Sequence, residues 1–239
     1  MPTIRILSYN LHGCRDMAAM CRTIQNSEAE FVALQNVTAL PSGYTLTNVA
    51  TQTGYLFSAE GGNGSLAILA RQPVKFIQTY ALGAGAYCMK LDLQNKDQRF
   101  IVLNVGLSGS FFKRLAQISS LLGPNLLETS TLSLPTVLLG DFYDIVWVSW
   151  NYRFNHQLRR HAPPLLRATY PACLPIFSRD RVYSMGGIQI SNVCINHSKD
   201  ARSATYHLPT NFNLKITDTR IALTARQQVQ AQRIKVVTN

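Results

Sequence analysis

The pattern of apolar and polar positions along the chain predicts many short strands and few helices. Residues 3–9 alternate well enough to form a strand, and residues 30–35 form a second short apolar one. Further strands are predicted at residues 66–70, 74–80, 87–93, 100–104, 135–139, 181–184, 188–195 and 211–216. Because many of these strands follow one another without a helix between them, the pattern argues against a simple doubly wound parallel sheet.

Helical spacing is clear in only two places. Asp16 is placed to cap a helix at its start, and residues 111–122 carry apolar side chains on one helical face. Residues 146–160 read as a helix or a structured loop, and the signal between residues 41 and 64 is weak. We therefore expect one domain over residues 1–216, followed by an extension over residues 217–239 whose composition favours neither helix nor strand.

The apolar strand at residues 135–139 leads directly to candidate chemistry. It ends at Gly140, and Asp141 then stands at the carboxyl edge of the strand, where α/β folds place their sites. A second acid follows at Asp144, with the aromatic Tyr143 directly before it. Two acids at such an edge suggest a centre for a hard cation or for a phosphate.

Composition describes a globular protein with a sizeable core and a basic surface. The chain has 239 residues, of which 46% are hydrophobic and 15% are charged. Its 23 lysines and arginines against 12 acids give a net charge of +11, which favours anionic partners such as nucleic acid, phospholipid headgroups or phosphorylated metabolites. A solvated basic face, centred on the arginine-rich residues 150–181, explains the same charge equally well. The composition predicts no oligomeric state.

The cysteines and histidines show no metal-binding pattern. Five cysteines, at positions 14, 21, 88, 173 and 194, form no CxxC pair and lie in or beside apolar stretches. They predict buried thiols in a reducing compartment, such as the cytoplasm, and no structural metal. The other histidines, at positions 12, 156, 161 and 197, share no ligand spacing. No basic segment precedes an apolar one at the start of the chain, and no stretch approaches the roughly 20 apolar residues of a membrane span.

Several short motifs occur in a fixed order along the chain. They are Ser8-Tyr9-Asn10-Leu11-His12, Ala33-Leu34-Gln35, Ala67-Ile68-Leu69-Ala70-Arg71, Gly140-Asp141-Phe142, Tyr170-Pro171-Ala172-Cys173-Leu174-Pro175, Arg179-Asp180-Arg181-Val182 and His207-Leu208-Pro209. Each motif alone is weak, but the ordered set over residues 3–216 resembles the endonuclease/exonuclease/phosphatase superfamily, and its small bacterial members most.

This resemblance implies both a fold and a chemistry. The fold is a four-layer α/β/β/α sandwich of two mixed sheets with helices outside. The chemistry is cleavage of phosphodiester or phosphomonoester bonds with a divalent cation, usually Mg²⁺. In active relatives a Glu after the second strand binds metal, and the Asp and Asn of a Gly-Asp-x-Asn motif activate and orient water. A His of an Asn-Thr-His motif assists at the phosphate, which a terminal Asp-His pair polarises.

Half of the eight expected polar residues are present at the matching positions of this sequence. The catalytic residues that the resemblance implies are Asn10, Asp141, Asp180 and His207. The substituted positions are Asn36 for the metal-binding Glu, Gly106 for the first His, Tyr143 for the Asn, and Tyr206 for the Asp before the terminal His. The metal ligands that remain are Asp141, Asn10 and Asn36.

The substitutions predict a weakened site. An amide at Asn36 removes the anionic ligand for which Mg²⁺ gives up its hydration water. With Tyr206 before it, His207 is expected to lack an orienting carboxylate and to be neutral. We therefore expect little or no hydrolysis and no bound cofactor, with Mg²⁺ or Mn²⁺ as the cofactor if the site is active.

Three of the retained residues also have purely structural interpretations. Asp141 is alternatively a turn-capping acid, and His207 a packed core histidine. Asp180, which lies between Arg179 and Arg181, is alternatively the centre of a structural ion pair.

The two tyrosines either fill the former cleft or form a stacking wall for a base or another flat ligand. In the second case Tyr143, Tyr206, Arg179 and Arg181 are candidate ligand-binding residues, and the arginines allow an anion to approach without a metal.

Three functional hypotheses follow from the sequence. The favoured one is a catalytically degenerate member of the superfamily that binds a phosphate-bearing partner. The second is an active metal-dependent phosphodiesterase or nuclease with a site rebuilt from Asn10, Asp141, Asp144, Asp180 and His207. The third is a structural or oligomeric module whose basic face is incidental.

Overall fold

The computed structural model describes residues 3–72, 74–95, 98–123, 126–127, 134–143, 158–161 and 168–217. The predictions made for Asp144, for residues 146–157 and for the extension beyond residue 217 therefore lie outside the described residues.

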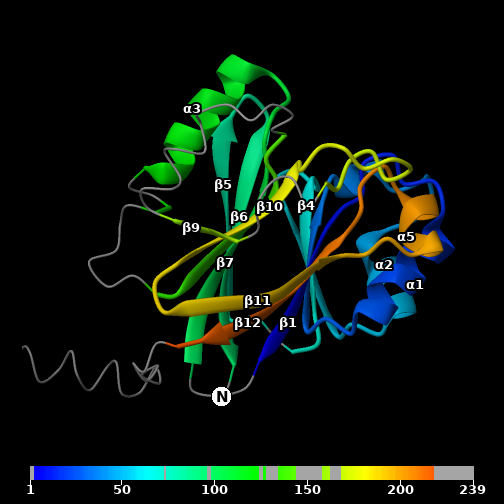
Figure 1. Ribbon diagram of the computed structural model, residues 1–239, viewed down its shortest axis with the longest axis horizontal. Coiled ribbons are helices and arrows are strands. Elements are labelled where there is room, and N and C mark those ends of the chain that lie inside the picture. Colours follow the sequence, from blue (N-terminus) through cyan, green and yellow to red (C-terminus); the bar gives the residue numbers. More distant parts are fainter. Residues whose placement is uncertain are drawn as a thin grey trace, which may run out of the picture.

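Alternating stretches of the sequence form two six-stranded sheets (Figure 1). The strands of the first sheet are β1 (Ile4–Asn10), β2 (Phe31–Gln35), β3 (Phe57–Gly61), β4 (Leu66–Ala70), β11 (Ile188–Ile195) and β12 (Thr210–Ile216). They lie in the order β11-β12-β1-β2-β4-β3, and the pair β1–β2 is parallel whereas the other pairs are antiparallel. The first sheet is therefore mixed.

The second sheet is also mixed. Its strands are β5 (Phe76–Gly83), β6 (Ala86–Asn95), β7 (Gln98–Gly106), β8 (Thr136–Asp141), β9 (Arg159–His161) and β10 (Asp180–Met185). They lie in the order β5-β6-β7-β8-β10-β9, with β7–β8 as the parallel pair. Each sheet thus brings the carboxyl ends of one parallel pair to an edge.

Helices cover the outer faces of both sheets (Figure 1). The helices are α1 (Met17–Ser27), α2 (Leu46–Thr53), α3 (Phe111–Leu122) and α5 (Lys199–Ala204), with a short 3₁₀ turn η1 at Val37–Ala39. Helices α1, α2 and α5 lie on the side of the first sheet, and α3 packs against the second. The predicted α/β sandwich of two mixed sheets with helices outside is confirmed.

The period-two pattern of the strands explains the layers. In β1, Ile4 and Ile6 face the core between the sheets, whereas Leu7 and Tyr9 face the core under α1. In β7, Val102 likewise faces the first core, and its neighbour Leu103 faces the core under α3. Successive side chains of a strand point to opposite faces, so strands buried on both sides are apolar throughout.

Several elements differ from the predictions. Helix α2 and strand β3 lie in the stretch of weak signal, and α5 was not predicted. Residues 159 and 160, assigned to a helix or loop, belong to strand β9. All five cysteines are free thiols, but Cys173 and Cys194 are exposed rather than buried as predicted. In the described ranges, no helix has the length and apolarity needed to cross a membrane.

Candidate functional site

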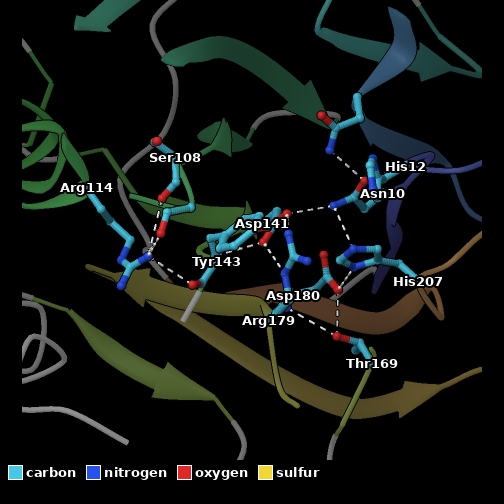
Figure 2. A network of polar contacts seen from close by, with 12 residues as sticks. Asn10, His12, Ser108, Arg114, Asp141, Tyr143, Thr169, Arg179, Asp180 and His207 are labelled. Atoms are coloured by element: carbon cyan, nitrogen blue, oxygen red, sulfur yellow. Dashed lines mark hydrogen bonds and ion pairs between the residues drawn. The ribbon is translucent and has the colours of Figure 1, made fainter. Parts of the chain in front are cut away.

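Polar side chains meet where the ends of several strands converge (Figure 2). Asn10 is the last residue of β1, Asp141 is the last residue of β8, and Asn36 follows β2 directly. Strand β10 runs antiparallel to β8, so its first residue, Asp180, lies opposite Asp141. The structure therefore brings together Asn10, Asp141 and Asp180 from the two sheets with His207, which lies between α5 and β12.

Asp141 is buried, and both of its oxygens accept hydrogen bonds. Oδ2 accepts from Nδ2 of Asn10 at 2.8 Å and from Nη2 of Arg179 at 2.6 Å. Oδ1 accepts from the backbone N–H of Tyr143 at 2.8 Å and lies 3.4 Å from Nε of Arg179. An aspartate in this state makes a poor base for a water molecule, because its charge is paired and its acceptor positions are occupied.

Arg179 is held between two aromatic rings. Its side chain is 4% exposed, and its guanidinium carbon lies 3.6 Å from the ring centroid of Tyr143 and 4.6 Å from that of Tyr170. Cation–π contacts with both rings and the edge-on pair with Asp141 fix the guanidinium in one orientation. Within the described part of the chain, the hydrogens of Nη1 have no partner.

His207 has a carboxylate partner, against the prediction from the sequence. Its Nδ1 lies 2.7 Å from Oδ2 of Asp180, which also accepts a 2.6 Å hydrogen bond from the hydroxyl of Thr169. Because an ionised carboxylate only accepts, Nδ1 carries the hydrogen of this bond. The expectation that Tyr206 leaves His207 unoriented is therefore wrong: the carboxylate comes from Asp180, 27 residues earlier in the chain.

The contacts of Asp180 in the described residues are not with the arginines on either side of it. Its partners are His207 and Thr169, whereas Arg179 pairs with Asp141. Arg181 bonds the carbonyl of Ser178.

The environment shifts the pKa values of the two aspartates in opposite directions. Burial raises the pKa of Asp141, the nearby Asp180 adds to this, and Arg179 opposes it. Burial also opposes the charge of Asp180, but its contacts with His207 and Thr169 outweigh this effect and lower its pKa. The charge of Asp180 is thus stabilised by its histidine partner.

A cavity of about 300 Å³ opens beside Asp141. Its walls include His12, Asn36, Gly106, Asp141, Tyr143 and Arg179, together with the loop residues Ala84, Gly85 and Ser108. His207 is fully buried and does not line this cavity, since Asn10 lies between it and Asp141. A ligand in the cavity would contact Arg179 and Asn36 but not His207.

The two tyrosines have different positions. Tyr143 lines the cavity, and its ring stacks against the guanidinium of Arg179. It therefore both occupies space at the cavity and forms a stacking contact. Tyr206 does not line the cavity. Tyr206 is 44% exposed, and its ring packs over Gly13 beside Arg15. Tyr206 is therefore neither a filler nor a wall of this cavity.

The position of Arg181 also differs from its prediction as a ligand-binding residue. It lies next to Asp180 in β10, so its side chain points to the opposite face of the sheet, towards Tyr183. Arg181 does not line the cavity.

The model of the Endonuclease/Exonuclease/phosphatase family matches residues 7–215 of this sequence. This match covers both sheets and every residue of the polar cluster. The chain belongs to the endonuclease/exonuclease/phosphatase family. A comparison with curated proteins finds no match.

Several solved structures share the fold at low sequence identity. A functionally unknown conserved protein from Enterococcus faecalis is 18% identical, with a TM-score of 0.71 over 89% of this chain and 100% of that one. A mannosyl-6-phosphatase from Bacteroides thetaiotaomicron is 14% identical, with a TM-score of 0.69 over 89% and 100%. An endonuclease/exonuclease/phosphatase from Bacteroides vulgatus is 11% identical, with a TM-score of 0.73 over 90% and 100%.

The divalent cation that the family implies does not fit the residues of this site. In the parts of the chain that the structure describes, no group of three His, Cys, Asp or Glu side chains is placed to hold a metal ion. Asp141 is the one carboxylate among the described residues that line the cavity, and Arg179 already neutralises it. Asn36 supplies an amide that donates to Oδ1 of Asn10 at 2.8 Å. This donor set lacks the anionic oxygens that Mg²⁺ requires.

Sequence reasoning missed several residues that shape the site. Thr169 lies just outside the motif that begins at Tyr170, and neither residue was assigned a role, yet they contact Asp180 and Arg179. Arg114 donates to the carbonyls of Ser108, Gly109 and Tyr143, which ties α3 to the rim of the cavity. The side chain of Gln117 bridges two loops of the same rim, from Gly83 to Ser108. No local pattern marks these contacts, because each joins separate loops.

The imidazole of His12 is expected to titrate below the ordinary histidine pKa of about 6.5. Burial lowers the pKa of His12, and electrostatic interactions with His207 and Arg179 add to this effect, so the folded state disfavours its protonation. The unfolded state then binds more protons between the lowered pKa and about pH 6.5, and stability rises with pH in that window. NMR titration of the His12 ring measures the midpoint, which the substitution Arg179→Met should raise.

The variant His12→Asn is the control for the stability measurement. This variant should show a weaker dependence of the free energy of unfolding on pH within the same window. A His12 midpoint above 6.5 in the unmodified protein would contradict this electrostatic description of the rim.

Proposed function

We propose that this protein is a catalytically degenerate member of its family that binds a phosphate-bearing partner without efficient hydrolysis. The observation that carries the proposal is the buried pair of Asp141 and Arg179, 2.6 Å apart in the wall of the cavity. The pair occupies the carboxylate on which activation of a water molecule would depend. It also presents a guanidinium to the cavity, and a guanidinium matches the geometry of phosphate oxygens.

The surroundings of Arg179 support a phosphate ligand. Nε and Nη2 face Asp141, which leaves Nη1 for an oxygen in the cavity. His12, Asn36 and Ser108 line the same space and supply further polar groups. The net charge of +11 would attract a phosphorylated metabolite, nucleic acid or lipid headgroup from a distance. We also propose that the protein acts in the cytoplasm, as its free cysteines favour a reducing compartment.

Binding is tested in EDTA with inorganic phosphate and with one oligonucleotide prepared with and without a terminal phosphate. Calorimetry should detect binding that EDTA leaves unchanged, and Arg179→Met should weaken it by tenfold or more, since a hydrogen bond to a charged group contributes about 1.5–3 kcal/mol. Arg22→Met removes the same charge from the surface pair with Asp200 and should have little effect.

Hydrolysis is tested with bis(p-nitrophenyl) phosphate, p-nitrophenyl phosphate and a labelled oligonucleotide in Mg²⁺ or Mn²⁺. We expect no cleavage above that of His207→Ala. Metal-dependent turnover that both His207→Ala and Asn10→Ala abolish would refute the degenerate assignment and would support an active phosphodiesterase or nuclease.

A further inference from the structure

The guanidinium of Arg179 and the side chains of Asp141, Asn10 and Asn36 form one hydrogen-bonded cluster. Asn36 donates to Oδ1 of Asn10 at 2.8 Å, Asn10 donates to Oδ2 of Asp141 at 2.8 Å, and Arg179 donates to the same Oδ2 at 2.6 Å. These oxygen-bearing side chains come from the ends of β1, β2 and β8. Arg179 is the one permanent cation among the described residues that line the cavity.

The position of this cation is fixed rather than incidental. The side chains of Arg179 and Asp141 are each 4% exposed, and the rings of Tyr143 and Tyr170 lie close to the guanidinium. A buried carboxylate needs a positive partner, because desolvation disfavours its charge strongly. In this cluster the positive partner of Asp141 is the side chain of Arg179, which is part of the chain and not a bound ion.

We propose that Arg179 is a tethered cation that takes the place of a divalent metal ion beside Asp141. The proposal has a direct consequence: the oxygens of Asn10, Asn36 and Asp141 become a divalent-cation site when the guanidinium is removed and a carboxylate is added at residue 36. This inference does not depend on the phosphate ligand proposed above.

Charge balance explains why both changes are needed. One arginine neutralises one carboxylate, whereas a divalent ion neutralises two. Asn36→Glu alone places a second carboxylate beside a guanidinium that already occupies the cluster. Arg179→Met alone leaves Asp141 as a single buried charge, which is too little for a cation that loses hydration water reluctantly. The pair Asn36→Glu/Arg179→Met restores balance only when a divalent ion binds.

The experiment measures binding of Mn²⁺ alone, by electron paramagnetic resonance and calorimetry, to the unmodified chain, both single variants and the double variant. We expect one Mn²⁺ per chain in the double variant, at least tenfold tighter than in the other three. Mn²⁺ should also raise the melting temperature of the double variant only. Adding Asp141→Asn to the double variant should remove both effects.

Arg99→Met is the matched control, because Arg99 pairs with Asp92 away from the cavity. It also frees a carboxylate, but it should create no Mn²⁺ site. Asn36→Glu/Arg179→Gln provides a second double variant that keeps a polar donor near Asp141.

Three results would overturn the proposal. The first is stoichiometric Mn²⁺ binding by the unmodified chain that Asp141→Asn removes. The second is binding by Asn36→Glu alone as tight as that of the double variant, since the guanidinium would then not occupy the place of the metal. The third is failure of both double variants to bind Mn²⁺, whether they fold or remain unfolded when refolded with Mn²⁺ present.

Discussion

Replacing Gly140 with alanine is expected to lower the free energy of unfolding by at least about 4 kcal/mol, or to prevent folding altogether. Gly140 has a φ of 131°, a conformation that side-chain-bearing residues rarely adopt. A Cβ atom at this position would lie 2.0 Å from the backbone oxygen of Val105. That oxygen belongs to β7, the parallel neighbour of β8, so it cannot move without disrupting the sheet. Chemical denaturation, or the soluble yield if the variant does not fold, measures the effect.

Gly106→Ala is the matched control for this prediction. Gly106 lies opposite Asp141 on the same pair of strands, and a Cβ atom there would meet only Leu66, at 3.7 Å. Its cost should stay below about 1 kcal/mol. Equal losses in the two variants would show that the close approach of Gly140 to Val105 is not what the sheet requires.

Asp141→Ala is expected to cost about 3–5 kcal/mol of stability, because it leaves the guanidinium of Arg179 buried without its charge partner. Arg179 is 4% exposed at its side chain, so water cannot replace the carboxylate. The two amide donors from Asn10 and Tyr143 also lose their acceptor. Denaturant unfolding of the variant beside the unmodified chain measures the loss.

A double-mutant cycle with Arg179→Met measures the interaction energy between Asp141 and Arg179 separately from the contacts that each residue makes with its surroundings. The double variant Asp141→Ala/Arg179→Met should be more stable than the sum of the single losses predicts, because neither charge is then stranded. Asp92→Ala, which breaks the more exposed pair with Arg99, should cost distinctly less. A cost for Asp141→Ala no larger than that of Asp92→Ala would contradict the buried-pair description.

Strand positions were predictable because their patterns are local. Residues 188–195 and 111–122 were assigned to a strand and a helix with the boundaries that β11 and α3 have. Helix α2 was missed since its eight residues are rich in threonine, and its start is marked by a capping box of Thr45 and Asn48 rather than by an acidic residue. Its stability comes from packing of Leu46 and Val49 on the first sheet, which a local pattern does not reveal.

The members of the site were predictable, but their pairing was not. The motifs marked Asp180 and His207 as site residues, yet only the fold shows that their side chains meet. The direction of the Arg179 side chain was equally hard to predict, because a residue just before a strand can point to either face of the sheet. In the structure Arg179 points towards Asp141, because the buried charge of this carboxylate requires a cation.

The hydrogen bond between Asn10 and Asp141 joins the ends of β1 and β8, which belong to different sheets. Most other contacts between the sheets are apolar and tolerate small sliding displacements, whereas a hydrogen bond requires a fixed direction. Asn104 of β7 adds further hydrogen bonds between the sheets near the same end, to Gln35 of β2 and to the carbonyls of Leu34 and Ala67. Any shear of one sheet over the other would therefore pivot about this end of the sandwich. Weakening the contact between Asn10 and Asp141 should loosen the alignment of the layers as well as the cavity beside it.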